Sequence, residues 1–253
     1  MKAEPPAPIP GTRPTGITEE KAAARYVRDL FSRIAGRYDL LNHLLSFQMD
    51  RYWRLVVARQ FRHRMTDPRA RVLDLCCGTA DLALALAREG PARIVGCDFA
   101  HPMLTRARQK LRQRSLAPLV AEGDALQLPF PDGTFDLVVS SFGFRNLANY
   151  RAGLAEIWRV LRPGGEVGIL EISKPRGWLG PFYSFYFHRI LPRIGEWISG
   201  VRGSYSYLPG SVARFPEKQD ITVWMRETSF SSVRAKELTG GIVTLYLGKK
   251  PEE

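Results

Sequence analysis

Short apolar runs alternate with helix-like stretches through the middle of the chain. The runs at 71–75, 93–97, 135–141 and 166–172 have the length of buried strands. Between them, apolar residues recur every three or four positions at 82–87, 101–115 and 150–161, which predicts helices. Strands that alternate with helices of this length form βαβ units. We therefore expect an α/β fold with a parallel sheet and right-handed crossovers.

Glycine and proline mark where these elements end. The sequence Arg162-Pro163-Gly164-Gly165 predicts a helix stop, and residues 128–134 predict a turn before the strand at 135–141. A short strand is expected at 119–121. Near the C-terminus, a helix from Asp220 precedes strands at 232–238 and 242–247. Because Thr239-Gly240-Gly241 joins these two strands, they are expected to form an antiparallel hairpin at the sheet edge.

The pattern divides the chain into five parts. The proline-rich start, residues 1–21, is expected to be a disordered tail, and residues 22–70 a helical segment with a polar link at 66–70. Residues 71–173 form the ligand-binding core, and residues 219–253 complete its sheet. Residues 174–218 interrupt the rhythm with closely spaced aromatic and basic residues, and are expected to form an insert over the core.

The turn after the first strand carries the first candidate chemistry. Asp74 ends an apolar run and is followed by Gly78, where the backbone can turn sharply, and by Thr79 and Asp81, which can cap the next helix. Asp98 ends the second strand, where a carboxylate can accept both hydroxyls of a ribose. The alternative is an ordinary strand–turn–helix unit with a capping acid.

The same turn lacks the Gly-x-Gly-x-x-Gly pattern that brings a pyrophosphate to a helix N-terminus. A carboxylate at Asp74 would repel phosphate, but it would suit a cationic ligand. A nucleoside that carries a sulfonium, S-adenosylmethionine, satisfies both conditions, and it is the cofactor we expect.

Composition and charge limit the class of protein. An apolar fraction of 45% suffices for a full core, and no apolar run approaches the roughly eighteen residues of a membrane span. The three cysteines lack metal-ligand spacing, and a reduced, cytoplasmic protein without a metal site is expected. The net charge of +12 leaves open nucleic acid, an anionic membrane surface or simple solubility.

Several longer motifs resemble the ubiquinone/menaquinone biosynthesis C-methyltransferase family over residues 26–249. The motifs are Tyr38-Asp with Asn42, Ser46 and Trp53-Arg54; Asp74-Leu with Gly78-Thr79 and Asp81; Ser141-Phe-Gly-Phe-Arg-Asn146; Leu161-Arg-Pro-Gly-Gly165; Glu171-Ile-Ser-Lys-Pro175; and Leu191-Pro-Arg-Ile-Gly195. The resemblance implies a class I methyltransferase (Rossmann-like) fold, with a seven-stranded sheet, helices on both faces and an antiparallel last hairpin.

The resemblance also implies an activity and a set of ligand contacts. The implied enzyme methylates a ring carbon of a polyprenyl quinol (demethylmenaquinol, with the ubiquinone precursor as a further candidate). The implied contacts to S-adenosylmethionine are Thr79, Asp98, Asp124, Ala125 and Ser141, with Asp74 and Gly78 in the glycine-rich turn. Two positions depart from the family pattern: Ala80 replaces a glycine, and Asp50 replaces a histidine.

Carbon methylation requires an electron-rich ring, which in turn requires an ionised phenol. Arg145 is expected to hold the phenolate and Asn146 the other ring oxygen, because both follow a strand at its carboxyl end. Tyr38 and Asp39 are expected to position the ring or take its proton. The alternatives are a surface ion pair for Arg145 and a helix cap for Asp39.

We expect the basic, aromatic insert to make peripheral contact with an anionic membrane at its inner face, and no nucleic acid to bind. Alternatively, its aromatic residues complete a core beneath a lid. A homodimer is left open. Two other functions also stay open at this point: methylation of RNA or another small molecule, and non-catalytic binding of a quinone or cofactor.

Overall fold

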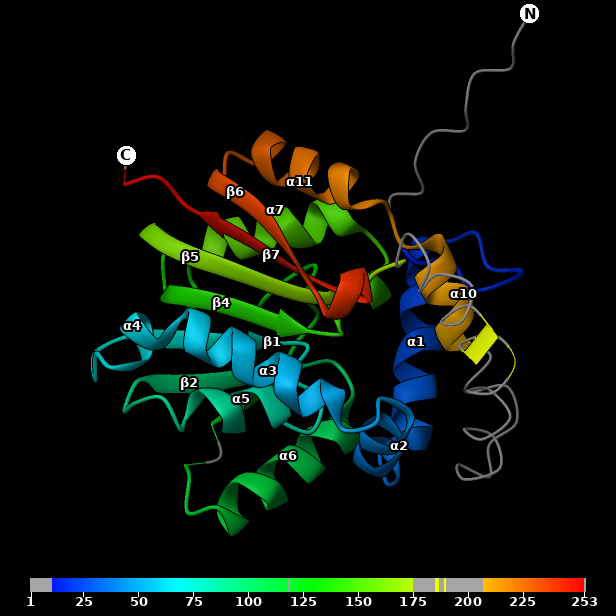
Figure 1. Cartoon of the computed structure of the whole chain (residues 1–253), viewed down its shortest axis with the longest axis horizontal. Helices are drawn as coiled ribbons and strands as arrows, with labels where there is room; N and C mark the ends of the chain where they lie inside the picture. The colour runs from blue at the N-terminus through cyan, green and yellow to red at the C-terminus, as the bar shows by residue number, and fades with distance from the viewer. Residues whose placement is uncertain (1–10, 118, 175–184, 187–188, 190–206, 253) are drawn as a thin grey trace, which may run out of the picture.

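Seven strands form one mixed sheet in the order β3-β2-β1-β4-β5-β7-β6 (Figure 1). The computed structural model describes residues 11–117, 119–174, 185–186, 189 and 207–252. The strands are β1 Arg71–Leu75, β2 Arg93–Asp98, β3 Val120–Glu122, β4 Phe135–Ser141, β5 Leu161–Ile172, β6 Ser231–Leu238 and β7 Val243–Lys249. Neighbouring strands from β3 to β5 pair in parallel, and β7 pairs antiparallel with both β5 and β6. This confirms the predicted seven-stranded class I methyltransferase sheet and its antiparallel hairpin.

Helices precede, connect and follow these strands. They are α1 Glu20–Ile34, α2 Tyr38–Leu45, α3 Met49–Gln60, α4 Arg62–Met65, α5 Asp81–Leu86, α6 His101–Gln113, α7 Tyr150–Val160, α10 Tyr207–Arg214 and α11 Lys218–Glu227. Short 3₁₀ turns lie at Phe144–Asn146 and Thr239–Gly241. The predicted helices in the N-terminal segment and between the strands are therefore confirmed.

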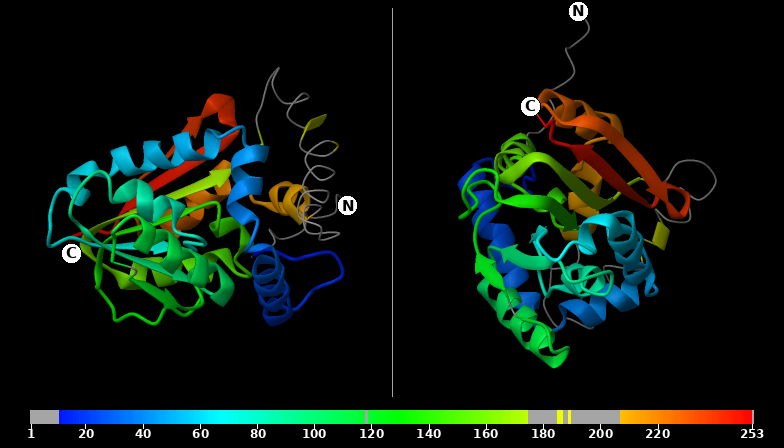
Figure 2. Two further views of the ribbon diagram at one scale, coloured as in Figure 1. Left: turned by 90° about the horizontal axis from the view of Figure 1, so that it is seen from below. Right: turned by 90° about the vertical axis from the view of Figure 1, so that its left-hand side faces the viewer.

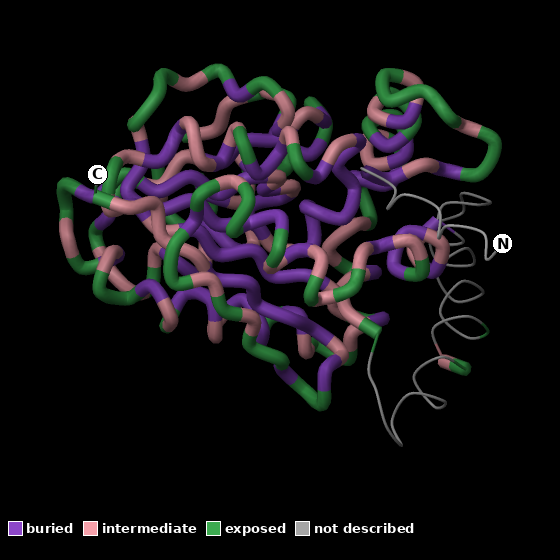
Figure 3. The backbone as a smooth tube through the Cα atoms, turned by 90° about the horizontal axis from the view of Figure 1, so that it is seen from above, coloured by how far each residue is buried: buried purple, intermediate pink, exposed green. Residues whose placement is uncertain are grey.

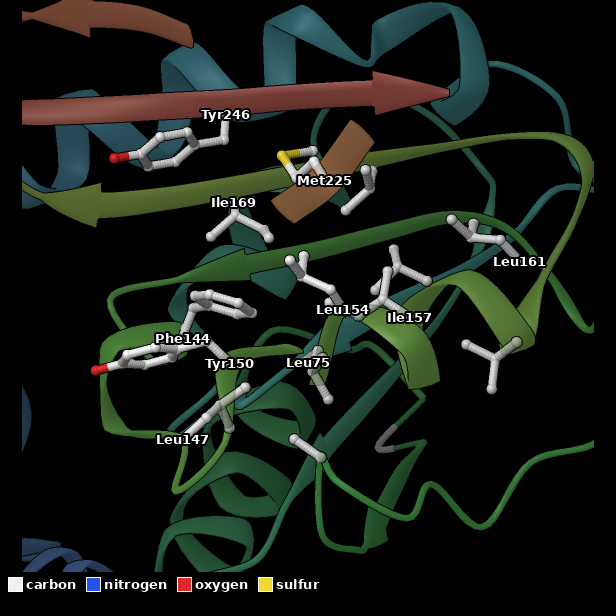
Figure 4. Close-up of a cluster of buried hydrophobic side chains, with 14 of the residues drawn as sticks. Leu75, Phe144, Leu147, Tyr150, Leu154, Ile157, Leu161, Ile169, Met225 and Tyr246 are labelled. Carbon is white, nitrogen blue, oxygen red and sulfur yellow. The ribbon is translucent and has the colours of Figure 1, made fainter. Parts of the chain in front are cut away.

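Each face of the sheet has its own buried core. In the tube coloured by burial, buried segments run through the middle of the molecule (Figure 3). On one face, Leu154 and Ile157 of α7 and Met225 of α11 lie over Ile169 and Tyr246 (Figure 4). Burying such a side chain contributes about 1.5–3 kcal/mol. The sheet is thereby fixed between two layers of helices.

On the other face, α3 and α5 pack closely over the central strands. Gly168 makes this approach possible, because a Cβ built there would lie 2.5 Å from Cε2 of Phe61, just after α3. The helix that carries much of the candidate site is thus held directly against β5.

Two local predictions need correction. Thr79 and Asp81 do not cap α5: the N-cap is Ala80, and none of the described side chains caps the helix there. Instead, Lys110 Nζ on α6 donates hydrogen bonds to Thr79 Oγ1 and Asp81 Oδ1. Strand β5 begins at Leu161, five residues earlier than predicted, because Leu161 already pairs with Phe135 before the register shifts.

Defined structure also begins within residues 1–21, which were predicted to be a disordered tail. Within the predicted tail, the Thr12 N–H donates to Leu147 O at 2.7 Å and its side chain is buried. Helix α1 starts at Glu20, just inside the predicted tail of residues 1–21. The expectation of disorder for residues 1–10 lies outside the described residues, and so does most of the 174–218 insert.

Helices α1, α2 and α10 gather beyond the carboxyl ends of the parallel strands (Figures 1 and 2). This is the edge at which doubly wound sheets bind ligands.

Cys76, Cys77 and Cys97 are all free, as predicted. Within the described ranges, no helix is long and apolar enough to cross a membrane.

Candidate active site

A cavity lies at the carboxyl ends of β1, β2 and β4, and we call it the strand-end cavity. It brings together most of the predicted ligand contacts, although they lie far apart in the sequence. Its lining includes Tyr38, Gly78, Asp98, Asp124, Ala125, Ser141, Phe142 and Asn146. The ends of these strands thus contribute to one cavity.

Asp98 is the best-placed anion in this cavity. Its Oδ2 accepts the Gly78 N–H and its Oδ1 accepts the Ala100 N–H, both at 2.9 Å. Burial raises the pKa of this carboxyl above its usual range, although the backbone hydrogen bonds oppose the shift. Each carboxylate oxygen can accept more than one hydrogen bond, so Asp98 retains capacity for the hydroxyls of a ribose.

Asp74 and Thr79 do not line the strand-end cavity. Asp74 Oδ2 accepts the Ala83 N–H at 2.9 Å and so ties β1 to α5, while its buried Oδ1 has no hydrogen-bond partner within the described part of the chain. Burial raises the pKa of Asp74 to about 7. Thr79 Oγ1 donates to Asp39 Oδ1 at 2.5 Å. In this geometry both residues support the turn, and their contact with a cofactor stays a prediction.

Ala80, where the resemblance implied a glycine, also lies outside the cavity lining. It has a φ of 69°, in the left-handed region that favours glycine. Its side chain packs with Ala83 and Ala107. The extra methyl group is therefore accommodated between α5 and α6.

Asp39 is directed into a separate charged cluster. Its Oδ2 lies 2.7 Å from Lys110 Nζ, which also contacts Asp81 Oδ1 at 2.5 Å. Asp39 lines neither the strand-end cavity nor the neighbouring one. The structure therefore separates it from Tyr38, Arg145 and Asn146, with which it was predicted to act.

A second cavity, of about 330 Å³, adjoins the first, and we call it the apolar cavity. Tyr38 and Phe142 line both cavities and so form their common wall. The rest of its lining is mostly apolar, with few charged side chains. The lining includes Leu45, Phe47, Met49, Asp50, Trp53, Arg54, Arg145, Ile172, Tyr186, Leu208 and Ile242.

Arg145 lines the apolar cavity from a buried position rather than a surface one. Its Nη1 lies 3.1 Å from Glu171 Oε2 and also donates to Phe142 O. Its Nε is buried and has no hydrogen-bond partner among the described residues. Asn146, by contrast, lines the strand-end cavity and accepts the Tyr207 hydroxyl at 3.1 Å. The two residues of one motif thus face different cavities.

Tyr38 lines both cavities, the one that Arg145 lines and the one that Asn146 lines. Burial raises the pKa of its phenol, and the charge of Arg145 opposes this shift. A phenol with a raised pKa stays protonated near neutral pH and can donate a hydrogen bond.

Arg54 is a site residue to which sequence reasoning assigned no role, although its motif was noted. The guanidinium pairs with Asp50 Oδ2 at 2.5 Å, donates to Ser141 Oγ at 3.3 Å, and lies 5.2 Å from the centre of the Phe142 ring. Burial raises the pKa of Asp50, but Arg54 and Ser46 outweigh it, and the net pKa is lowered. The available signal was an Asp–Arg pair four residues apart on one face of the helix.

Donor atoms of His43, Asp50 and Asp81 lie within 4.8 Å of one another, a spacing that could suit a metal ion. Both carboxylates already pair with cations, Asp50 with Arg54 and Asp81 with Lys110. A divalent ion would therefore compete with two ion pairs, and this donor set fits a metal poorly.

S-adenosylmethionine fits the strand-end cavity by the chemistry of its donors. Asp98 offers carboxylate oxygens suited to ribose hydroxyls, and Gly78 leaves its side-chain position open, with the nearest Tyr38 atom 3.8 Å from a built Cβ. Asp124 and Ser141 add polar side chains to the wall, and Ala125 lies beside them.

This sheet order, with its antiparallel final hairpin and a ligand cavity at the strand ends, defines a class I methyltransferase. A solved methyltransferase from Aquifex aeolicus, described as SAM dependent, shares the fold with a TM-score of 0.53 at 16% identity, over 77% of this chain and 97% of that one. Residues 17–250 match the model of the ubiE/COQ5 methyltransferase family, and the chain belongs to that family.

Two relatives are similar over nearly their whole lengths. The demethylmenaquinone methyltransferase of Deinococcus radiodurans is 45% identical over 239 residues, 94% of this chain and 97% of the relative. The demethylmenaquinone methyltransferase of Thermus thermophilus is 47% identical over 224 residues, 88% of this chain and all of the relative. The family suggested by the motifs is thereby confirmed.

Proposed function

We propose that this protein transfers a methyl group from S-adenosylmethionine to a ring carbon of a demethylated polyprenyl quinol, demethylmenaquinol. One observation carries the proposal: an apolar cavity of about 330 Å³ shares the wall formed by Tyr38 and Phe142 with the strand-end cavity. An apolar ring beside a nucleoside site matches this substrate, and the names of the two relatives support the same choice.

The cofactor, when bound, supplies an electrophilic methyl group. The chain supplies the contacts that hold it: the carboxylate of Asp98, the open turn at Gly78, and the wall of Asp124, Ala125 and Ser141. Placing two reactants on either side of one wall replaces a bimolecular encounter with an oriented one.

On the substrate side, the chain favours an ionised quinol. Arg54 and Arg145 both line the apolar cavity, and a nearby cation lowers the pKa of a phenol. We assign the Arg145 guanidinium, which lines this cavity, to one ring oxygen. Because its raised pKa keeps the Tyr38 phenol protonated, its hydroxyl donates a hydrogen bond to a ring oxygen and so positions the ring.

The substrate also suggests where the protein works. A polyprenyl tail stays in lipid, so the enzyme has to collect the quinol at a bilayer, and we place it at the cytoplasmic face as a peripheral protein. The net charge of +12 favours contact with anionic lipid.

The direct test supplies purified protein with methyl-labelled S-adenosylmethionine and tailed demethylmenaquinol, and locates the label in the product by mass spectrometry and NMR. Label on the ring carbon is expected. Menaquinol, which already carries the methyl group, is the matched control and should stay unlabelled. Transfer to oxygen, or no transfer to any quinol, would overturn the proposal.

A further inference from the structure

Helix α2 exposes apolar side chains on a face next to the one that makes its core contacts. Leu40 is 60% exposed, Leu44 48% and Phe47 73%, whereas Leu41 and Leu45 are buried. Leu40 and Leu44 are four residues apart and so share one face of the helix. The Phe47 N–H donates to Leu44 O at 3.1 Å, which places Phe47 directly beyond them. We call Leu40, Leu44 and Phe47 the α2 apolar surface.

The backbone at the end of this surface is strained. Phe47 has a φ of 51° and Gln48 a φ of 64°, two successive non-glycine residues in the left-handed region. That conformation is uncommon, and for a bulky side chain it is a genuine outlier. The strain holds an aromatic ring in an exposed position, and strained residues cluster at functional sites.

The α2 apolar surface is continuous with the apolar cavity. Phe47 belongs to the surface and also lines the cavity. Its neighbours Leu45 and Tyr186 line the cavity as well. The Tyr186 hydroxyl donates to Leu45 O at 2.9 Å, and its ring centre lies 5.5 Å from that of Phe47. A quinol ring held in the cavity can therefore leave its tail at this surface.

The charges around the surface suit an anionic bilayer. Arg33 and Arg37 precede this surface in the sequence and Arg51 follows it, and all three are exposed. The acids in the same stretch, Asp39 and Asp50, each pair with a cation, Lys110 and Arg54. Apolar side chains within a basic border are typical of segments that insert into the interface of anionic membranes.

We propose that the α2 apolar surface inserts into an anionic lipid bilayer, and that Phe47 lies at the mouth through which the quinol ring passes into the apolar cavity. The polyprenyl tail then remains in lipid while the ring reacts. This inference rests on the proposed quinol substrate, but the membrane contact can be tested without it.

The first test is flotation with vesicles of phosphatidylcholine, with and without phosphatidylglycerol. The double variant Leu40→Ser/Leu44→Ser should lower the partition coefficient on anionic vesicles about tenfold. Val223→Ser is the matched control, because Val223 is an apolar residue of α11 that is 45% exposed, and it should bind like the wild type. Equal binding of both variants would overturn the proposal.

Other occupants of the surface give different results. If the wild type does not float with anionic vesicles but forms a dimer that the double variant abolishes, the surface is a contact between copies and the proposal fails. Arg33→Gln/Arg51→Gln should weaken binding only where phosphatidylglycerol is present. If the double Gln variant binds anionic vesicles as well as the wild type does, the proposed attraction of these arginines to anionic lipid is wrong.

The second test compares two substrates with the same double variant. Leu40 and Leu44 do not line the apolar cavity, so kcat/KM for a tailless demethylmenaquinol in solution should stay unchanged. With tailed demethylmenaquinol in anionic vesicles, kcat/KM should fall about tenfold, in parallel with partitioning. An equal effect on both substrates would contradict the proposal. If the wild type methylates neither quinol, the proposed function fails, while flotation still decides the membrane contact.

Discussion

Arg145 and Glu171 form an ion pair inside the protein: Nη1 and Oε2 lie 3.1 Å apart, and their side chains are 6% and 0% exposed. Breaking a buried pair by removing one partner leaves an uncompensated charge, which costs about 3–5 kcal/mol. We therefore expect Glu171→Gln to lower the free energy of unfolding by about this amount, as measured by denaturant titration.

A second glutamate on the same strand is the control for this prediction. Glu166 pairs with Arg64 at 2.8 Å in a partly exposed position, and Glu166→Gln should cost about 1 kcal/mol or less. If the two variants lose similar amounts of unfolding free energy, burial of the Arg145–Glu171 pair adds nothing to its contribution to stability.

Asp98 is expected to set the affinity for the cofactor. Hydrogen bonds to a charged group contribute about 1.5–3 kcal/mol each, so Asp98→Asn should raise the dissociation constant of S-adenosylmethionine at least about tenfold. Calorimetry measures the constant. Asp136→Asn is a suitable control, because Asp136 accepts the Arg71 N–H at the opposite end of the sheet. An unchanged constant in a folded Asp98 variant would make this carboxylate purely structural.

Asp74 should make stability depend on pH. Burial raises its pKa from 3.8 to about 7, so the folded protein holds a proton that the unfolded chain releases. Its contribution to stability is full at low pH and falls as pH rises from about 4 to about 7, at up to about 1.4 kcal/mol per pH unit. Above about pH 7 the loss is complete.

The variant Asp74→Asn removes this titration. The difference in unfolding free energy between the wild type and the variant should shift in favour of the variant as pH rises through that window, and then level off. Taking the difference cancels the other groups with raised pKa values, Asp98 and Glu171. A difference that is constant from pH 4 to 8 would contradict the buried, protonated state of Asp74.

The strand ends could be predicted from sequence because each signal is local. Asp98 and Ser141 follow apolar runs, and parallel strands bring such ends to one edge. Asp39 was expected to act beside Tyr38, but it lines neither cavity, and its carboxylate pairs with Lys110 on α6, a distant partner that no local pattern identifies. The role of Arg54 depends on how α3 packs against β4 and the Phe142 loop, which no local pattern encodes.

Arg54 is expected to act on the ionisation of the quinol. If its charge stabilises a quinolate, Arg54→Gln should lower kcat about tenfold near neutral pH, which corresponds to about 1.4 kcal/mol. The loss should shrink toward about pH 10, where a phenol ionises without help. Arg54→Lys keeps a positive charge but loses the forked geometry, and should recover part of the activity at neutral pH. The measurement is kcat for the tailless quinol from pH 7 to 10, with the melting temperature of each variant as the folding control. A loss that is uniform across this range, or no recovery with lysine, would assign Arg54 to the support of Asp50 and Ser141 alone.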